Sequence, residues 1–286
     1  MDRKKILIAG LPESGKTTYL GALIHILDSG EVETALKYDG DPEDRAYLNT
    51  IVDTWLQFKR MKRTFHGSED SIELNLLNGD EKLLLKIPDL SGETWKGLWS
   101  QRQCNENVDE LMADVDSMMF FIHSDQIKKP ISIMEMARQQ EALGEKPTPS
   151  IASDWQADKD CPTQVMVVDI LQIIAEQNRN KSPINLAIIL STWDTAESFN
   201  CTPKEFIKEK LPLLDQYLKS KYDYPNFSVY GVSAQGADLD FEENSDALKG
   251  QIQKLNMFEK TSERVLIFGE QDHKHDLSLP IKKLLK

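Results

Sequence analysis

The chain has 286 residues, with 34 Lys and Arg against 47 Asp and Glu, so its formal net charge is −13. Hydrophobic residues make up 40% and charged residues 28%, a composition that excludes a disordered, collagen-like or membrane-spanning chain. The acidic balance argues against broad nucleic-acid binding, which needs clustered Lys and Arg, but it allows a local pocket for one small phosphate ligand. The length allows one large domain or two small ones.

The three cysteines, Cys104, Cys161 and Cys201, lie far apart and have no metal-ligand spacing, so we expect reduced thiols. The first apolar stretch is broken by Gly10 and Pro12, which makes it too short for a signal peptide. No window reaches the length of a membrane span. We therefore expect a cytoplasmic protein.

The first half of the chain opens with a short apolar run that ends in glycine, followed by a helical repeat of leucine and isoleucine. The run at 5–9 predicts a buried strand, and the repeat at 20–27 predicts a helix closed by Gly30. A second helical stretch covers about 48–58. Strands are predicted at 72–77 and 82–87, joined by an Asn-Gly-Asp turn, and at 118–122.

The second half begins with a long excursion at 126–160, whose length is typical of functional or disordered loops. We predict that Thr163 caps a helix over 163–174. Pro212 lies inside a helical run at 202–218, where it predicts a kink or a restart. Further strands are expected at 186–190, 227–232 and, more weakly, 265–268, with a terminal helix at 279–285. This alternation predicts an α/β fold with a mostly parallel sheet covered on both faces.

The clearest motif is Gly10-Leu11-Pro12-Glu13-Ser14-Gly15-Lys16-Thr17, which matches G-x-x-x-x-G-K-[ST] between a strand and a helix. Backbone N–H groups of such a loop and the helix N-terminus bind a polyphosphate. We expect Lys16 to reach the β- and γ-phosphates and the Thr17 hydroxyl to coordinate Mg²⁺. Pro12 removes one N–H donor. The predicted phosphate contacts are Glu13, Ser14, Gly15, Lys16, Thr17 and Thr18.

A second motif, Pro88-Asp89-Leu90-Ser91-Gly92-Glu93, follows the apolar strand at 83–87. An acid at the end of such a strand holds Mg²⁺ through water, which assigns Asp89 to the metal. The Gly92 N–H can approach a γ-phosphate because glycine permits close contact with the backbone.

Two more motifs follow buried strands. In Ser191-Thr192-Trp193-Asp194, the Asp194 carboxylate can accept hydrogen bonds from the N1–H and 2-amino group of guanine, donors that adenine does not offer. In Ser233-Ala234-Gln235-Gly236, the backbone N–H groups can hold the guanine O6. The predicted base contacts are therefore Thr192, Asp194, Ser233, Ala234 and Gln235.

These four motifs, each at a strand end, resemble the signature of the translation-factor-like P-loop GTPases, which include the Ras-like proteins. The resemblance covers most of the chain and implies a three-layer P-loop fold, one antiparallel edge hairpin, and Mg²⁺ with GTP or GDP. The Ser-Thr-Trp-Asp variant, the Pro-Asp-Leu-Ser-Gly-Glu segment and the closing 275–281 are similar to the bacterial double-GTPases of conflict systems. We expect one GTPase domain over 1–286, with an extended switch I at about 31–65 and an insertion at about 126–160.

The sequence also departs from the family pattern. Thr192 replaces the lysine whose stem lies on the base, so base stacking should be weaker. Glu93 replaces a glutamine that orients the attacking water, so hydrolysis is slow or uses another group; an exposed switch residue is an equal alternative. The resemblance places the Mg²⁺-ligating threonine of switch I at Thr64. Arg60 or Arg63 is a candidate for acting on the transition state, although we favour a basic surface run.

We expect hydrolysis of GTP to GDP and phosphate, with Lys16, Gly92, Glu93 and Arg63 as the candidate catalytic residues. The expected role is a switch for a protein effector or a second GTPase, with 126–160 as the first candidate partner element. A nucleotide-binding scaffold that barely hydrolyses is the first alternative. A phosphotransferase needs an arginine-rich lid, and the excursion contains only Arg138. An ATPase is disfavoured by Asp194.

Overall fold

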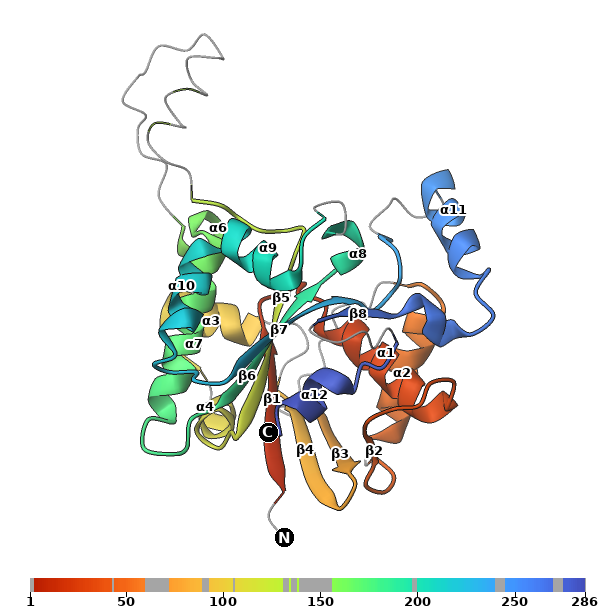
Figure 1. Ribbon diagram of the computed structural model, residues 1–286, viewed down its shortest axis with the longest axis horizontal. Helices are drawn as coiled ribbons and strands as arrows, with labels where there is room; N and C mark the ends of the chain where they lie inside the picture. The colour runs from red at the N-terminus through yellow and green to blue at the C-terminus, as the bar shows by residue number, and fades with distance from the viewer. Residues whose placement is uncertain are drawn as a thin grey trace.

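Figure 1 shows the computed structural model, in which helices cover both faces of an eight-stranded sheet. The structure describes residues 3–42, 44–59, 72–88, 93–104, 106–130, 134, 138, 156–196, 200–239, 245–269 and 275–285. The strand order is β2-β3-β4-β1-β5-β6-β7-β8. The strands are β1 (Lys4–Gly10), β2 (Lys37–Tyr38), β3 (Ile72–Asn78), β4 (Glu81–Ile87), β5 (Ser117–His123), β6 (Asn185–Ser191), β7 (Phe227–Ser233) and β8 (Leu266–Phe268).

Strands β4, β1, β5, β6 and β7 run parallel, so their carboxyl ends share one edge of the sheet. Ligands of open α/β sheets bind at this edge. β3 is antiparallel to β4 across the Gly79–Asp80 turn, which confirms the expected hairpin. β2 extends that antiparallel edge, and β8 adds an antiparallel strand at the opposite edge. The predicted mostly parallel α/β sheet is therefore confirmed.

One face of the sheet is covered by α3 (Glu93–Gln101), α4 (Glu106–Ala113), α6 (Ala157–Asp160), α7 (Thr163–Gln177), α9 (Pro203–Lys210) and α10 (Pro212–Ser220). Successive strand side chains point to opposite faces, so every second strand residue enters this layer. The strand residues in this core are Leu7, Ala9, Met118, Phe120, Ile122, Leu186, Ile188, Leu190 and Val229. Because these side chains are buried, the layer holds the parallel strands in a fixed register.

The other face is covered by α1 (Lys16–Ser29), α2 (Arg45–Leu56) and α12 (Leu279–Lys283). Gly21 allows α1 to approach α2 closely, because a Cβ there would lie 3.0 Å from the Cβ of Trp55. The short α8 (Trp193–Ala196) follows β6 directly. Figure 1 shows α11 (Asp246–Leu255) projecting from one end of the molecule, and Leu255 is the buried residue of this helix.

Two local predictions are refined by the structure. Thr163 does not cap α7; it is the first helical residue after Pro162, and its hydroxyl accepts a hydrogen bond from Lys128 N–H at 2.9 Å. Pro162 takes the N-cap position instead, because its ring fixes φ at a value that suits the extended backbone before a helix. Pro212 produces a restart rather than a kink, with α9 ending at Lys210 and α10 beginning at Pro212.

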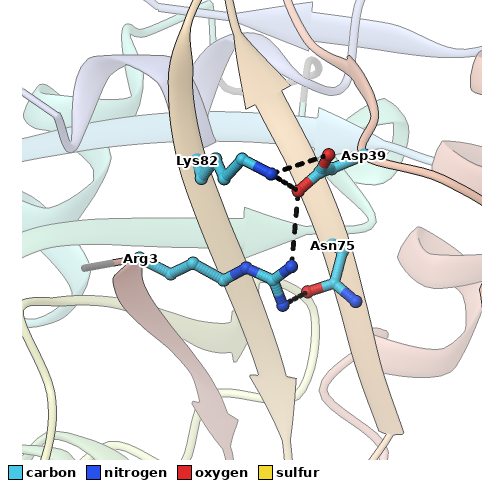
Figure 2. Close-up of polar contacts among 4 residues, drawn as sticks. All are labelled: Arg3, Asp39, Asn75 and Lys82. Carbon is cyan, nitrogen blue, oxygen red and sulfur yellow. Dashed lines mark hydrogen bonds and ion pairs between the residues drawn. The ribbon is translucent and has the colours of Figure 1, made fainter. Parts of the chain in front are cut away.

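An acidic side chain ties the segment after α1 to the edge of the sheet (Figure 2). Asp39 accepts hydrogen bonds from Lys82 at 3.0 and 3.3 Å and from Arg3 at 3.4 Å. Arg3 also donates to Asn75 Oδ1 at 2.6 Å. Exposed ion pairs stabilise little individually, but this group joins three separate segments of the chain and so fixes where β2 lies.

Two further expectations concern the whole chain. Cys104, Cys161 and Cys201 are free thiols, as the sequence predicts. Across the part of the chain that the structure describes, no helix combines the length and the apolar character needed to cross a membrane.

Candidate nucleotide site

The glycine-lysine loop lies between β1 and α1, at the carboxyl edge of the sheet. Gly10 and Gly15 have φ of 150° and 83°, a region that favours glycine. A Cβ on Gly10 would lie 2.7 Å from the carbonyl oxygen of Phe121, and one on Gly15 would lie 2.9 Å from Ser191 Cβ. Both glycines are therefore required for the loop to fit against β5 and β6.

Lys16 is buried at the start of α1, although it carries a charge. Its Nζ donates hydrogen bonds to the carbonyl oxygens of Gly10 and Leu11, both at 2.9 Å, and to Ser14 Oγ at 3.4 Å. These contacts hold the ammonium group within the curve of the loop. The first N–H groups of a helix have no intrahelical partner, so the loop presents donors and a positive charge together.

The Ser191–Asp194 segment packs directly against this loop. Gly15 faces Ser191, and Thr192 has a left-handed φ of 53° that turns the chain from β6 into α8. Ser124 Oγ donates to the Thr192 carbonyl oxygen at 3.1 Å, and Thr195 Oγ1 donates to the same oxygen at 2.7 Å. The turn that carries Asp194 is therefore held from both sides.

Asp194 and Ser233 connect the third and fourth motifs. The Ser233 side chain hydrogen-bonds to the Asp194 carboxyl group, so the ends of β6 and β7 meet at this point. Burial raises the pKa of Asp194, and the hydrogen bond from Ser233 opposes that shift. Ser233 Oγ also accepts from Gly236 N–H at 3.1 Å, which closes the turn over 233–236.

The turn at 234–236 is braced by two residues that the sequence reasoning did not select as part of the site. Trp55 Nε1 donates to the Ala234 carbonyl oxygen at 2.9 Å, and Gln235 Nε2 donates to the Trp55 carbonyl oxygen at 3.3 Å. Arg264 donates to that same Trp55 oxygen at 3.3 Å, and its guanidinium lies 3.8 Å from the Trp55 ring centroid. α2 therefore supports the predicted base-binding turn.

Arg264 is buried to an unusual degree for a cation, with 3% of its surface exposed. Burial lowers its pKa to about 10, so the guanidinium stays charged at neutral pH. The guanidinium carbon also lies 4.6 Å from the centroid of the Phe58 ring, so Arg264 contacts two aromatic rings. The attraction of a cation for aromatic faces compensates for part of the lost hydration.

The other predicted site residues lie partly within and partly outside the described part of the chain. Thr17 and Thr18 are partly buried in the first turn of α1, and α3 begins at Glu93. His123 ends β5 beside Thr192, with its Nδ1 3.4 Å from Thr192 Oγ1. The candidates that lie outside the described residues are Arg63, Thr64, Asp89 and Gly92.

The oxygen atoms available at the loop suit an Mg²⁺ ion that is held mainly by a bound phosphate better than they suit a metal ion held by protein side chains alone. Within the described ranges, no group of three or more His, Cys, Asp and Glu is arranged to hold a metal ion. The Thr17 hydroxyl makes no hydrogen bond to another described residue, and Thr17 directly follows Lys16 in the first turn of α1. Mg²⁺ in nucleotide sites takes one or two protein oxygens and completes its octahedron with phosphate and water.

The fold and the loop define a P-loop GTPase-type nucleotide-binding protein. The sequence profile of the Double-GTPase 1 family matches residues 7–284, and the chain belongs to this family. No curated protein sequence matches the chain. The family assignment confirms the predicted P-loop GTPase class and its double-GTPase subgroup, and it supports a GTP-binding protein.

Solved structures of GTPases resemble the chain at low identity. They include the Arl6 BBS3 small GTPase of Trypanosoma brucei with GppNp (13% identity, 89% of this chain, 96% of that chain, TM-score 0.40). The S. cerevisiae Ski7 GTPase-like domain with GDP and phosphate matches at 14% identity over 91% of this chain and 52% of that chain, with a TM-score of 0.44. A bacterial selenocysteine-specific elongation factor, EF-Sec, matches at 13% over 92% and 30%, with a TM-score of 0.31.

Proposed function

We propose that this protein binds GTP with Mg²⁺ and hydrolyses it to GDP and phosphate. The observation that carries the proposal is the convergence of three motifs on one edge of the sheet. Gly15 of the phosphate loop packs against Ser191, and Asp194 hydrogen-bonds to Ser233. A phosphate cradle and a base-selecting carboxylate thus lie next to each other, as a nucleoside triphosphate site requires.

The triphosphate end of the proposed site is formed by the loop and the start of α1. Lys16 binds the β- and γ-phosphates, exchanging its contacts to the carbonyl oxygens of Gly10 and Leu11 for phosphate oxygens. The N–H groups over Glu13–Thr18 bind the remaining oxygens through the helix N-terminus. Local donors therefore hold a polyanion on a chain whose net charge is −13.

The guanine end is formed by Asp194, Thr192 and the turn that contains Ser233, Ala234 and Gln235. Partial burial raises the pKa of Asp194, so further donors to its carboxylate are favourable. The N1–H and 2-amino group of guanine supply two donors to that carboxylate, whereas adenine supplies neither. This pairing favours GTP over ATP because an adenine leaves the carboxylate without these two donors.

Catalysis of phosphate transfer to water depends on positioning the attacking water and on electrostatic stabilisation of the charge on the phosphates. The residues assigned to Mg²⁺ are Thr17, Thr64 and Asp89, and the ion neutralises charge on the β- and γ-phosphates when bound. Glu93, the first residue of α3, accepts a hydrogen bond from the attacking water, while the Gly92 N–H and Lys16 stabilise the γ-phosphate oxygens. Arg63 is the candidate cation for the charge that develops in the transition state.

The proposed role is a nucleotide-dependent switch that acts on a protein effector or a second GTPase in a bacterial defence system. The nucleotide-sensing segments would be about 31–65 and the residues that precede α3. The defence setting rests on the resemblance of the chain's motifs to the double-GTPases of conflict systems, and membership of the Double-GTPase 1 family is consistent with that resemblance. Ordering of switch segments around a γ-phosphate is the general way in which such proteins present a partner surface.

A steady-state phosphate-release assay tests the enzymatic proposal. We expect wild-type protein to release phosphate from GTP with Mg²⁺, and Lys16→Ala to lose roughly a hundredfold or more of the rate. Lys254→Ala on α11 removes a lysine remote from the site and should keep the wild-type rate. A rate that Lys16→Ala leaves unchanged contradicts hydrolysis at this site. If wild-type protein binds GTP tightly but releases no phosphate, the protein is the nucleotide-binding scaffold of the first alternative.

A further inference from the structure

Two hydrogen bonds tie the turn at 234–236 to one residue of α2. Trp55 Nε1 donates to the Ala234 carbonyl oxygen at 2.9 Å, and the Trp55 carbonyl oxygen accepts from Gln235 Nε2 at 3.3 Å. A trans peptide is planar, with its C=O and N–H pointing in opposite directions. The bond to the Ala234 carbonyl oxygen therefore also fixes the direction of the Gln235 N–H, which belongs to the same peptide and points away from the indole.

Arg264, at the end of the short 3₁₀ helix at Thr261–Arg264, contacts both the turn and Trp55. Gly236 has φ of 89°, and a Cβ there would lie 2.5 Å from the Arg264 carbonyl oxygen, so the end of the turn packs on the Arg264 backbone. The Arg264 guanidinium donates to the Trp55 carbonyl oxygen at 3.3 Å and lies 3.8 Å from the centroid of its ring. One residue therefore holds the turn with its backbone and, with its side chain, the tryptophan that orients the turn.

The charge of Arg264 acts in the same direction as its contacts. A cation on the face of an indole ring draws electron density toward itself, which makes the Trp55 Nε1–H a stronger donor to Ala234. Hydrogen bonds in series polarise one another, so the N–H at the other end of that peptide becomes more positive. A turn whose N–H groups are strengthened in this way favours a base with an acceptor at position 6, such as the guanine 6-oxygen, over one with an amino group there.

We propose that Arg264 is a positioning residue for recognition of the guanine 6-oxygen. It acts through Trp55 and through the backbone at Gly236, which together orient the N–H groups of the turn, whereas Asp194 binds the N1–H and the 2-amino group. This inference rests on the proposed function, because it takes guanine as the bound base. It goes further by assigning positions 6 and 2 of the base to separate groups, so a defect at one position should leave recognition of the other unchanged.

Two analogues of GDP separate the two positions. 6-Thio-GDP keeps the N1–H and the 2-amino group but carries sulfur, a weaker acceptor, in place of the 6-oxygen. Inosine diphosphate keeps the N1–H and the 6-oxygen but lacks the 2-amino group. The measurement is competition of each analogue against fluorescent GDP on the full chain at neutral pH. We expect wild-type protein to prefer GDP over 6-thio-GDP by about tenfold, the value of one good hydrogen bond.

Substitutions of Arg264 should change one preference and not the other. Arg264→Met should reduce the preference for GDP over 6-thio-GDP to about twofold and leave the preference for GDP over inosine diphosphate at the wild-type value. Arg264→Lys keeps the charge and should restore part of the lost preference. The matched control, Arg179→Met, removes the same charge in the segment before β6, at the amino edge of the parallel strands, and should keep both preferences.

Trp55→Phe provides a second variant if Arg264→Met does not fold. It keeps a ring beside Arg264 but removes the donor to Ala234, so it should lower the same preference for GDP over 6-thio-GDP. A wild-type preference at position 6 in these variants overturns the role of Arg264. An equal loss of both preferences also overturns it, because a general loosening of the site would act on both positions. Wild-type protein that binds ADP as tightly as GDP overturns the proposed function, and this inference with it.

Discussion

Replacing Gly231 by alanine should destabilise the protein and weaken guanine-nucleotide binding at the same time. Gly231 lies in β7 beneath the Trp193 ring, and a Cβ there would lie 2.3 Å from Trp193 Cδ2 and 2.5 Å from Cγ. Carbon atoms in favourable contact are about 3.5–4.0 Å apart, so the overlap exceeds about 1 Å. The indole cannot simply move aside, because it is 2% exposed and its centroid lies 5.4 Å from that of Phe206.

Overpacking of this kind costs about 1–3 kcal/mol, and the short distances place Gly231→Ala at about 3 kcal/mol. Trp193 separates Thr192 from Asp194 in the chain, so its displacement also moves the carboxylate that we assign to guanine. We expect GDP affinity to fall by about tenfold, since a small misplacement weakens both carboxylate hydrogen bonds.

Urea denaturation and fluorescent GDP titration measure the two effects. Gly250→Ala on α11 is the matched control, because a Cβ there meets no atom within 4 Å. Helix propensity predicts that this control is neutral or stabilising by up to about 1 kcal/mol. If Gly231→Ala unfolds within about 0.5 kcal/mol of wild type and binds GDP normally, the reasoning about this contact is refuted.

Two further substitutions probe the same region. Trp55→Phe removes the hydrogen bond to Ala234 but keeps an aromatic ring beside Arg264. We expect the free energy of unfolding, measured by urea denaturation, to fall by about 1–2 kcal/mol, and GDP release, measured by stopped flow, to become faster. If both values are unchanged, Trp55 does not support the turn at 234–236. Because burial raises the pKa of Asp194, this group stabilises the nucleotide-free fold at acidic pH, and that contribution is lost as the pH rises through the raised folded-state pKa. Asp194→Asn should therefore gain stability over wild type as the pH rises toward neutrality while binding GTP less tightly; a difference independent of pH would contradict the assignment.

The phosphate loop and the buried strands were predictable because their signals are local. Gly10, Gly15 and Lys16 lie within a few residues of one another, and the turn they form follows from that spacing alone. The hairpin at Gly79 was predictable for the same reason. Each of these features depends on neighbours in sequence rather than on the final fold.

Other features depend on contacts between distant parts of the chain. Trp55 contacts Ala234 across 179 residues and Arg264 across 209, so nothing near Trp55 marks it as part of the site. Thr163 looked like a helix cap, but the loop at Lys128 uses its hydroxyl. The sequence reasoning placed no helices over 93–113, and Trp95 and Trp99 of α3 are buried there because the sheet face is present.

Several of the predicted site residues lie outside the described part of the chain. The roles of Arg63, Thr64, Asp89 and Gly92 fall outside the described residues, as does most of the insertion at 126–160. The single-domain reading of 1–286, with an extended switch I at about 31–65, is likewise still a prediction.

Competition between GTP and ATP for wild type, Asp194→Ala and the remote control Asp246→Ala tests the central claim most directly. Loss of two charge-assisted hydrogen bonds is worth about 3 kcal/mol or more, a factor of about a hundred. The account predicts that wild type and Asp246→Ala prefer GTP by about that factor, and that Asp194→Ala binds GTP more weakly and discriminates poorly. A preference for GTP that persists in Asp194→Ala would contradict it.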